Sequence, residues 1–183
     1  MGFDFDGVIA YNPLRIARAP ISYIKRIVLS SQKTEFYVPK NFVERMLFYV
    51  PHLMSIMPGI GMGLVRELVE NGVIEAHVVS GRYGYLESGL RTWIKYQRLE
   101  HVFTSIHTNR NDEQPHLFKE KKLRELGIEY FVEDNLDIVR HLASHGKTKI
   151  MWIYNIFDKT VEYEYKYPHI HSALKEILRI KKL

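Results

Sequence analysis

The stretch Phe3-Asp4-Phe5-Asp6-Gly7-Val8, near the beginning of the chain, places two carboxylates two residues apart after a short apolar run. We predict that residues 2–6 form a strand, in which side chains repeat every two residues, so that both carboxylates project to one side. Gly7 permits a tight departure of the backbone from this strand. Two carboxylates about 7 Å apart along a strand can hold a hard cation while one stays free for chemistry.

Beyond this stretch, apolar segments typical of strands alternate with segments of helical periodicity. We expect strands at 2–6, 73–79, 102–106, 128–132 and 149–154, and helices at 13–31, 39–56, 60–71, 84–98, 115–126, 136–145 and 168–182. A turn is predicted at Ser80-Gly81-Arg82. This alternation predicts an α/β fold with a Rossmann-like, three-layer parallel sheet and right-handed crossovers.

Polar and acidic residues follow the ends of the predicted strands. They are Asp4, Asp6, Ser80, the segment after Ile106, Glu133, Asp134, Asp137 and Asn155. Ligands of parallel sheets bind beyond the carboxyl ends of the strands, so these residues predict one convergent site. Asp134 could supply a further oxygen ligand from a second strand end, and Mg²⁺ prefers oxygen ligands.

The composition excludes several classes of protein. The 183 residues suit one domain or one domain with a small insertion. The absence of cysteine excludes disulfides, thiolate metal sites and cysteine nucleophiles. We expect no signal peptide, since the charged motif begins at Asp4, and no apolar run reaches the roughly 20 residues of a membrane span. We therefore expect a soluble cytoplasmic protein with no membrane partner.

Four motifs, in this order, carry a family resemblance. The first is the Asp4-Phe5-Asp6-Gly7-Val8 stretch, and the second is the apolar segment that ends in Ser80-Gly81-Arg82. The third is Lys119, eight residues before Gly127, and the fourth is Phe131-Val132-Glu133-Asp134-Asn135. Together they resemble the haloacid dehalogenase superfamily of aspartyl-phosphate-forming phosphohydrolases, and the resemblance covers residues 2 to about 155.

The resemblance implies a role for each motif residue. Asp4 would be the nucleophile, and Asp6 would protonate the leaving oxygen and later help to deprotonate water. Substrate phosphate would be bound by Ser80, Gly81, Arg82 and Lys119. Mg²⁺ would be held by Asp4, the backbone carbonyl of Asp6 and Asp134. The acid at Asp6 favours hydrolysis of a phosphate ester or phosphomutase chemistry, since dehalogenases of the superfamily lack it and transport ATPases carry threonine there.

Some assignments stay open at this stage. Lys121 and Lys122 compete with Lys119 for the third motif, because residues 119 and 122 are neighbours on one helical face. Glu133 could contact the metal through water or be structural. Asp137 could support the site or be a charge favoured by the helix dipole. Only three residues precede Asp4, so the native start could lie upstream of Met1.

An insertion over residues 11–57 divides the predicted core into residues 1–10 and 58–183. Pro58-Gly59-Ile60 marks the return to the core. The insertion holds seven basic and two acidic residues, while the rest of the chain holds nineteen of each, so it carries the entire net charge of +5. The resemblance implies a small helical cap, and its charge favours a small phosphorylated substrate with more than one negative group. The later motifs most resemble the 5′-nucleotidase-like branch.

Two other functions remain open. The basic insertion could serve a nucleic-acid end phosphatase or a nucleic-acid-binding module, although no nucleic-acid-binding motif accompanies it. The chain could also be an inactive scaffold.

His141 and His145 have a metal-binding spacing but lie in a last helical turn, where a capping role is favoured. Trp152 and Tyr154 could stack bases, but strand core is favoured. The sequence leaves the oligomeric state open.

Overall fold

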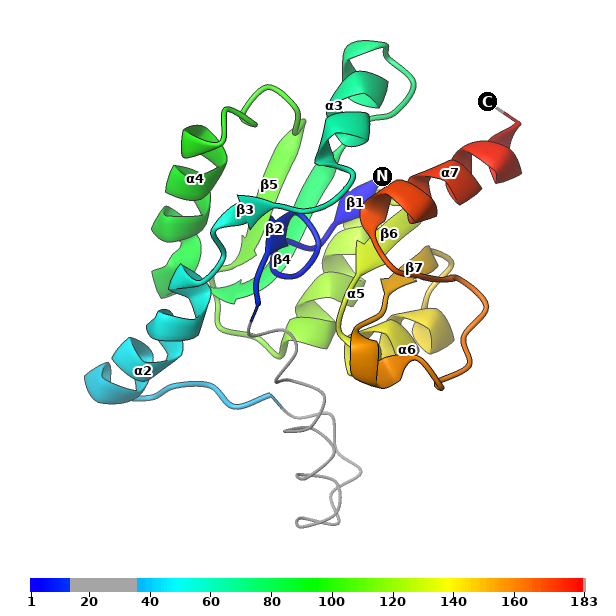
Figure 1. The fold of residues 1–183 in the computed structure, drawn as a ribbon. Helices are drawn as coiled ribbons and strands as arrows, with labels where there is room; N and C mark the ends of the chain where they lie inside the picture. Colours follow the sequence, from blue (N-terminus) through cyan, green and yellow to red (C-terminus); the bar gives the residue numbers. More distant parts are fainter. Residues whose placement is uncertain (14–35, 183) are drawn as a thin grey trace.

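A computed structural model describes residues 1–13 and 36–182 of the chain (Figure 1). Its main sheet has six strands in the order β5-β4-β1-β6-β7-β8, and all of its paired strands run parallel. The strands are β1 (Gly2–Phe3), β4 (His77–Tyr83), β5 (Ser105–Asn109), β6 (Tyr130–Glu133), β7 (Lys149–Ile153) and β8 (Lys166–Tyr167). The predicted α/β class with a parallel sheet is confirmed.

Helices cover both faces of the sheet, which gives three layers. They are α3 (Met62–Glu70), α4 (Glu87–Tyr96), α5 (Pro115–Glu125), α6 (Leu136–His145) and α7 (Ile170–Lys181), with short 3₁₀ turns η1 (Gly84–Leu86) and η2 (Ile156–Asp158). Buried side chains of α3, α4 and α7 form one apolar core with the sheet. Those of α5 and α6 form a second core on the other face. The helices α3, α4, α6 and α7 are amphipathic and bury one apolar face each, whereas α5 contributes mainly Phe118 and Leu123 to the second core.

The central strand β1 is shorter than predicted. It pairs with β4 and β6 only at Gly2 and Phe3, although the amide of Asp4 still donates to the carbonyl of Val132 at 2.9 Å. The chain then turns, and Gly7 takes a positive φ of 81°, which glycine adopts without strain. The two carboxylates therefore do not project from one extended strand, and that part of the prediction is wrong.

A small two-stranded antiparallel sheet, whose strands flank the insertion, follows this turn and was not predicted. Strand β2 (Ala10–Tyr11) pairs antiparallel with β3 (Met57–Pro58), with Ala10 opposite Pro58. The amide of Gly59 also donates to the carbonyl of Ile9 at 2.8 Å. This two-stranded sheet brings both ends of the insertion together next to the end of β1 (Figure 1).

Strand β4 corrects another prediction. Residues 80–82 were predicted as a turn, but the strand continues to Tyr83 with an irregular register between Ser80 and Tyr83. This irregularity is a local bulge against β5, and bulges re-aim side chains at strand ends. It keeps Ser80 and Arg82 at the edge of the sheet where β1 ends.

Of the insertion, the structure describes residues 11–13 and 36–57. Helix α2 (Phe42–Leu53) lies within the predicted helix 39–56. Most of the predicted helix 13–31 lies outside the described residues, so the complete helical cap stays a prediction. The apolar side chains of α2 are largely exposed, as at Phe42, Val43, Met46, Leu47 and Val50. None of the helices in the described ranges is long and apolar enough to cross a membrane.

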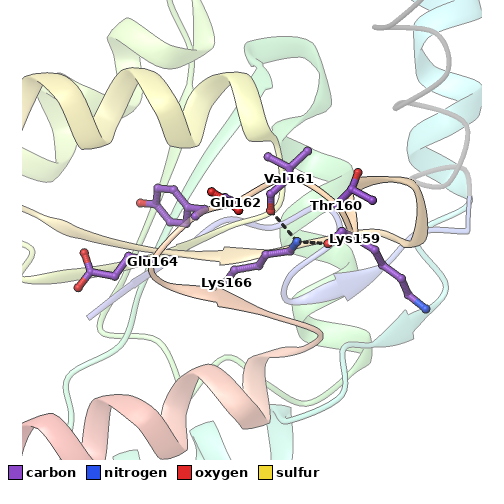
Figure 2. Close-up of a pocket in the computed structure, with 7 residues that line it drawn as sticks. Lys159, Thr160, Val161, Glu162, Glu164 and Lys166 are labelled. Carbon is purple, nitrogen blue, oxygen red and sulfur yellow. Dashed lines mark hydrogen bonds between the residues drawn. The ribbon is translucent and has the colours of Figure 1, made fainter.

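A loop between η2 and β8 is organised around the ammonium of Lys166 (Figure 2). Its Nζ donates to the carbonyl oxygens of Asp158, Lys159 and Val161 at 2.9, 2.7 and 2.7 Å. It also lies 5.4 Å from the ring centre of Trp152. Trp152 is fully buried, as predicted for a core residue of β7. Lys166 thus fixes a loop that has little regular secondary structure of its own.

Candidate active site

A buried lysine joins two acidic residues at the carboxyl edge of the sheet. Nζ of Lys119 lies 2.9 Å from Oδ1 of Asp4 and 2.6 Å from Oε2 of Glu133. Lys119 comes from α5, Asp4 follows β1, and Glu133 ends β6. All three residues are almost inaccessible to solvent. The structure therefore brings the predicted residues Asp4 and Lys119 together and adds Glu133 to them.

The close approach of α5 to β4 explains how Lys119 reaches this position. A Cβ atom at Gly81 would lie 2.9 Å from Cβ of Pro115, the first residue of α5, and 3.6 Å from Cε of Lys119. The first distance is shorter than carbon atoms tolerate, so glycine at position 81 lets the helix pack directly on the strand. Ser80 lies beside it and is buried, and its Oγ accepts from the amide of Arg82 at 3.3 Å.

The structure separates Lys119 from its two competitors. Lys122 pairs with Glu125 on the same helix, and Lys121 is exposed, 3.9 Å from Glu113. Among the described residues, neither forms an ion pair with Asp4 or Glu133. Lys119 therefore occupies the position that the sequence left open among the three lysines.

Charge is unevenly balanced within this cluster. Burial raises the pKa of Asp4 well above its usual value, the charge of Glu133 raises it further, and Lys119 opposes both. Burial likewise raises the pKa of Glu133. Burial alone would lower the pKa of Lys119, but the charges of Asp4 and Glu133 outweigh it and raise the pKa. One ammonium does not compensate several buried carboxylates, so the cluster favours either a proton or an additional cation.

The carboxylates form a group that fits a metal ion. Asp4, Glu133 and Asp134 each offer one oxygen, and within the described residues these oxygens lie within 4.8 Å of one another. Glu133 is oriented by the amides of Asp134 and Asn135, at 3.2 and 3.0 Å from its Oε1. Oxygen ligands with excess negative charge suit Mg²⁺. The side chain of Asp6 is not in this group, and its predicted contribution through the backbone carbonyl stays a prediction.

Asp6 instead faces a guanidinium. Nε and Nη2 of Arg82 donate to Oδ2 and Oδ1 of Asp6, both at 2.7 Å. Arg82 also lies over the ring of Phe5, 4.6 Å from its centre, and both charged residues are buried. Such a bidentate pair stabilises the ionised carboxylate and fixes its orientation. Arg82 was predicted to bind substrate; the structure places its side chain on Asp6.

Residues of the insertion complete the surroundings of Asp6, and the sequence did not reveal them. Oγ of Ser55 donates to Oδ1 of Asp6 at 2.9 Å, and Nδ2 of Asn12 donates to Ser55 at 3.3 Å. Nε2 of His52, in the last turn of α2, lies 4.0 Å from Oδ2 of Asp6. Their sequence signal is weak, because each is a single polar residue whose partner lies more than 40 positions away. Asp137, left open above, lies in the first turn of α6, where its amide donates to Oδ1 of Asn135 at 3.0 Å.

Comparison with known proteins identifies the fold of the chain. No protein-family model and no curated protein sequence matches the chain. Solved structures do match. A haloacid dehalogenase-like hydrolase of Streptococcus pneumoniae aligns with a TM-score of 0.60 and 11% identity over 98% of this chain and 96% of that one. The chain has the haloacid dehalogenase-like fold.

Two further structures share this fold with the protein. A haloacid dehalogenase superfamily hydrolase of Ehrlichia chaffeensis has a TM-score of 0.55 and 16% identity, covering 98% of this chain and 96% of its own. CbbY of Rhodobacter sphaeroides, solved with phosphate, has a TM-score of 0.58 and 13% identity, covering 95% and 97%. At these identities the likeness establishes the fold, whereas the chemistry has to be argued from the site itself.

Proposed function

We propose that the protein is a Mg²⁺-dependent phosphatase that hydrolyses a phosphate monoester of a small metabolite through an aspartyl phosphate on Asp4. The observation that supports this most strongly is the position of Asp4. Its carboxylate touches Lys119 and shares an acidic group with Glu133 and Asp134. Phosphoryl transfer depends on positioning and charge stabilisation, and this cluster offers both.

In the first step, a carboxylate oxygen of Asp4 attacks phosphorus while the P–O bond to the leaving oxygen breaks. Lys119 holds Asp4 in place and offsets charge on the nucleophile and on the transferring group. Ser80, with a buried hydroxyl beside the bulge of β4, would bind a phosphoryl oxygen. Asp4, Glu133 and Asp134 would hold Mg²⁺, which supplies charge neutralisation for the phosphoryl oxygens when it is bound.

In the second step, water attacks phosphorus of the aspartyl phosphate, which releases phosphate and restores Asp4. Asp6 would accept the proton of this water. Its ion pair with Arg82 and its hydrogen bond from Ser55 favour the ionised form that a base requires. As an acid in the first step, Asp6 must first gain a proton against that pairing. We therefore expect good leaving groups, which need little protonation, to be hydrolysed fastest.

The substrate class follows from the insertion. Its basic excess favours a substrate with more than one negative group, and a nucleotide 5′-phosphate is one such compound. A panel of nucleotides, sugar phosphates and oligonucleotides with terminal phosphates would separate these classes. Preference for the oligonucleotides would overturn the metabolite assignment, and a steep salt dependence would accompany it.

Hydrolysis of an aryl phosphate tests the reaction class. Wild type and Asp4→Asn are compared with and without Mg²⁺, with Lys122→Met as a control at a partly buried position of α5 that pairs with Glu125. We expect turnover that requires Mg²⁺, disappears in Asp4→Asn and persists in the control. Turnover of the Asp4→Asn protein at the wild-type rate would contradict the proposal. Absence of turnover in every protein, across the whole substrate panel, would favour the inactive scaffold.

A further inference from the structure

A group of histidines lies between α5 and α6, outside the site described above. His116 and Glu120 are one turn apart on α5, and His141 and His145 are one turn apart on α6. Residues four apart share one helical face. The two helices pack side by side on one face of the sheet (Figure 1). Both pairs therefore meet between the helices, whereas Lys119 points from α5 into the acidic cluster.

The four side chains are already in direct contact. The ring of His141 meets that of His116 edge to face, with 4.6 Å between ring centres, and stacks on that of His145, with 4.4 Å between centres. Nε2 of His141 lies 2.8 Å from Oε2 of Glu120. Three imidazoles and one carboxylate from two helices thus occupy one small region.

Two ring nitrogens have environments that suit a metal ligand. Nδ1 of His116 is buried and has no hydrogen-bond partner within residues 1–13 and 36–182. Leaving such a nitrogen unpaired costs free energy, which a bound cation would recover. Nδ1 of His145 lies 2.8 Å from the carbonyl oxygen of His141 and 2.8 Å from Oγ of Ser144. In the tautomer that donates from Nδ1 to this carbonyl, Nε2 is left as a lone-pair donor.

Charge and exposure are compatible with cation binding. Glu120 is held by Arg124 on one oxygen and by His141 on the other. A carboxylate that accepts from one ring nitrogen orients the imidazole for a metal on the other. His145 is exposed, so solvent reaches the group.

We propose that His116, His141 and His145 bind one zinc-type transition-metal ion between α5 and α6, with Glu120 orienting His141. Neutral imidazoles suit Zn²⁺ and related ions, whereas the oxygens of the Asp4 group suit Mg²⁺. In the described structure the three rings meet edge to face or stacked, and their nitrogens do not converge on one point, so binding requires the rings to rotate about their side-chain bonds. The bound ion would join α5, which carries Lys119, to α6, which begins directly after the acidic pair at 133–134.

Zinc titration of the full chain tests this proposal. The protein is freed of metal with a chelator, dialysed, and titrated with Zn²⁺ by calorimetry in excess Mg²⁺, which competes for the carboxylates of the Asp4 group. We expect one zinc ion per chain and a higher melting temperature. In His116→Ala and His141→Ala the affinity should fall at least about tenfold. Glu120→Gln should weaken it within the 10–100-fold range typical of residues that orient a ligand.

Two further variants keep the result interpretable. His145→Ala changes an exposed residue, so its fold should persist, and it too should lose affinity. His101→Ala changes an exposed histidine beside Glu70, away from this group, and should bind like wild type. Wild-type affinity in His145→Ala and His141→Ala would overturn the proposal. So would zinc binding that is lost in Asp134→Asn but kept in the histidine variants, because the ion would then occupy the Asp4 group.

Discussion

Nζ of Lys119 lies 2.9 Å from Oδ1 of Asp4, and the side chains of both residues are buried at the carboxyl edge of the sheet. This contact joins a helix that follows β5 to the residue that follows the central strand. It fixes the orientation of the carboxylate on which the proposed chemistry depends.

Loss of Lys119 should affect both stability and turnover. In Lys119→Met, the carboxylates of Asp4 and Glu133 lose a shared buried counter-charge, and we expect the free energy of unfolding to fall by about 3–5 kcal/mol. Turnover should fall at least about 100-fold, as for other groups that stabilise transition-state charge. Urea unfolding and steady-state kinetics measure the two effects. Lys122→Met, which breaks only a pair with Glu125 on the same helix, should change stability by less than about 0.5 kcal/mol.

Mg²⁺ should stabilise the protein through the acidic group. At a Mg²⁺ concentration 100 times the dissociation constant, the free energy of unfolding should rise by about 2.7 kcal/mol. Thermal unfolding with and without Mg²⁺ checks this. Asp134→Asn removes one of the three carboxylates and should abolish most of the shift. An unchanged shift in that variant would place the bound ion elsewhere.

The stability of the metal-free protein should depend on the ionisation of Asp4. Its pKa in the folded protein is raised above the ordinary 3.8, by burial first and by Glu133 second. The folded state therefore holds this proton more tightly, so the stabilisation is complete below pH 3.8 and is lost as pH rises through the raised folded pKa. Relative to wild type, Asp4→Asn should become more stable over that window, by about 1.4 kcal/mol per pH unit. Chelator-treated proteins unfolded at several pH values measure this difference, and a constant difference would contradict the assignment.

Arg82 should control the second step of the reaction. Arg82→Lys keeps the charge but loses one of the two hydrogen bonds to Asp6. We expect breakdown of the aspartyl phosphate to slow by roughly 10–100-fold, less than the ~10²–10⁴-fold that complete loss of acid–base catalysis typically costs. Rapid-quench kinetics separates the two steps. Arg110→Lys offers a matched control, because Arg110 forms a similar bidentate ion pair with Glu87 on the surface. If both variants behave alike, the Arg82–Asp6 pair is structural only.

Lys166 should stabilise its loop without affecting catalysis. Its ammonium donates three hydrogen bonds to backbone carbonyls, and hydrogen bonds to charged groups contribute about 1.5–3 kcal/mol each when buried. Since this site is partly exposed, we expect Lys166→Met to lower the free energy of unfolding by about 2 kcal/mol in total. Turnover should be unchanged. Lys159→Met, in the same loop with an exposed side chain, should have little effect (Figure 2).

The sequence predicts the helices that the structure describes, five of the six strands of the main sheet and their parallel arrangement, because their apolar periodicity is strong. It fails where local pattern is absent. The two-stranded sheet of β2 and β3 has two residues in each strand, too few to show an alternation of apolar and polar residues. The turn predicted at 80–82 is wrong because Gly81 serves the close packing of α5, not a reversal of the chain.

The motifs predict which residues gather in the candidate site, but they do not predict the contacts between them. Asp4 and Lys119 follow from motif order, and burial then distinguishes Lys119 from Lys122. The pair of Asp6 and Arg82 spans 76 positions, and neither residue alone indicates the other. Ser55 reaches Asp6 because the pairing of β2 with β3 returns the insertion to the end of β1. Such contacts depend on tertiary structure rather than on any local sequence signal.

Intact-protein mass spectrometry of Asp6→Asn tests the central claim most directly. An aryl phosphate needs little acid assistance to leave, so this variant should transfer its phosphoryl group in the presence of Mg²⁺ and then hydrolyse slowly. Acid quenching should reveal one added phosphoryl group per chain, located by peptide mapping at Asp4 and absent from the Asp4→Asn/Asp6→Asn double variant. A phosphoryl group on another residue, or turnover of the aryl phosphate by Asp4→Asn at the wild-type rate, would contradict the account.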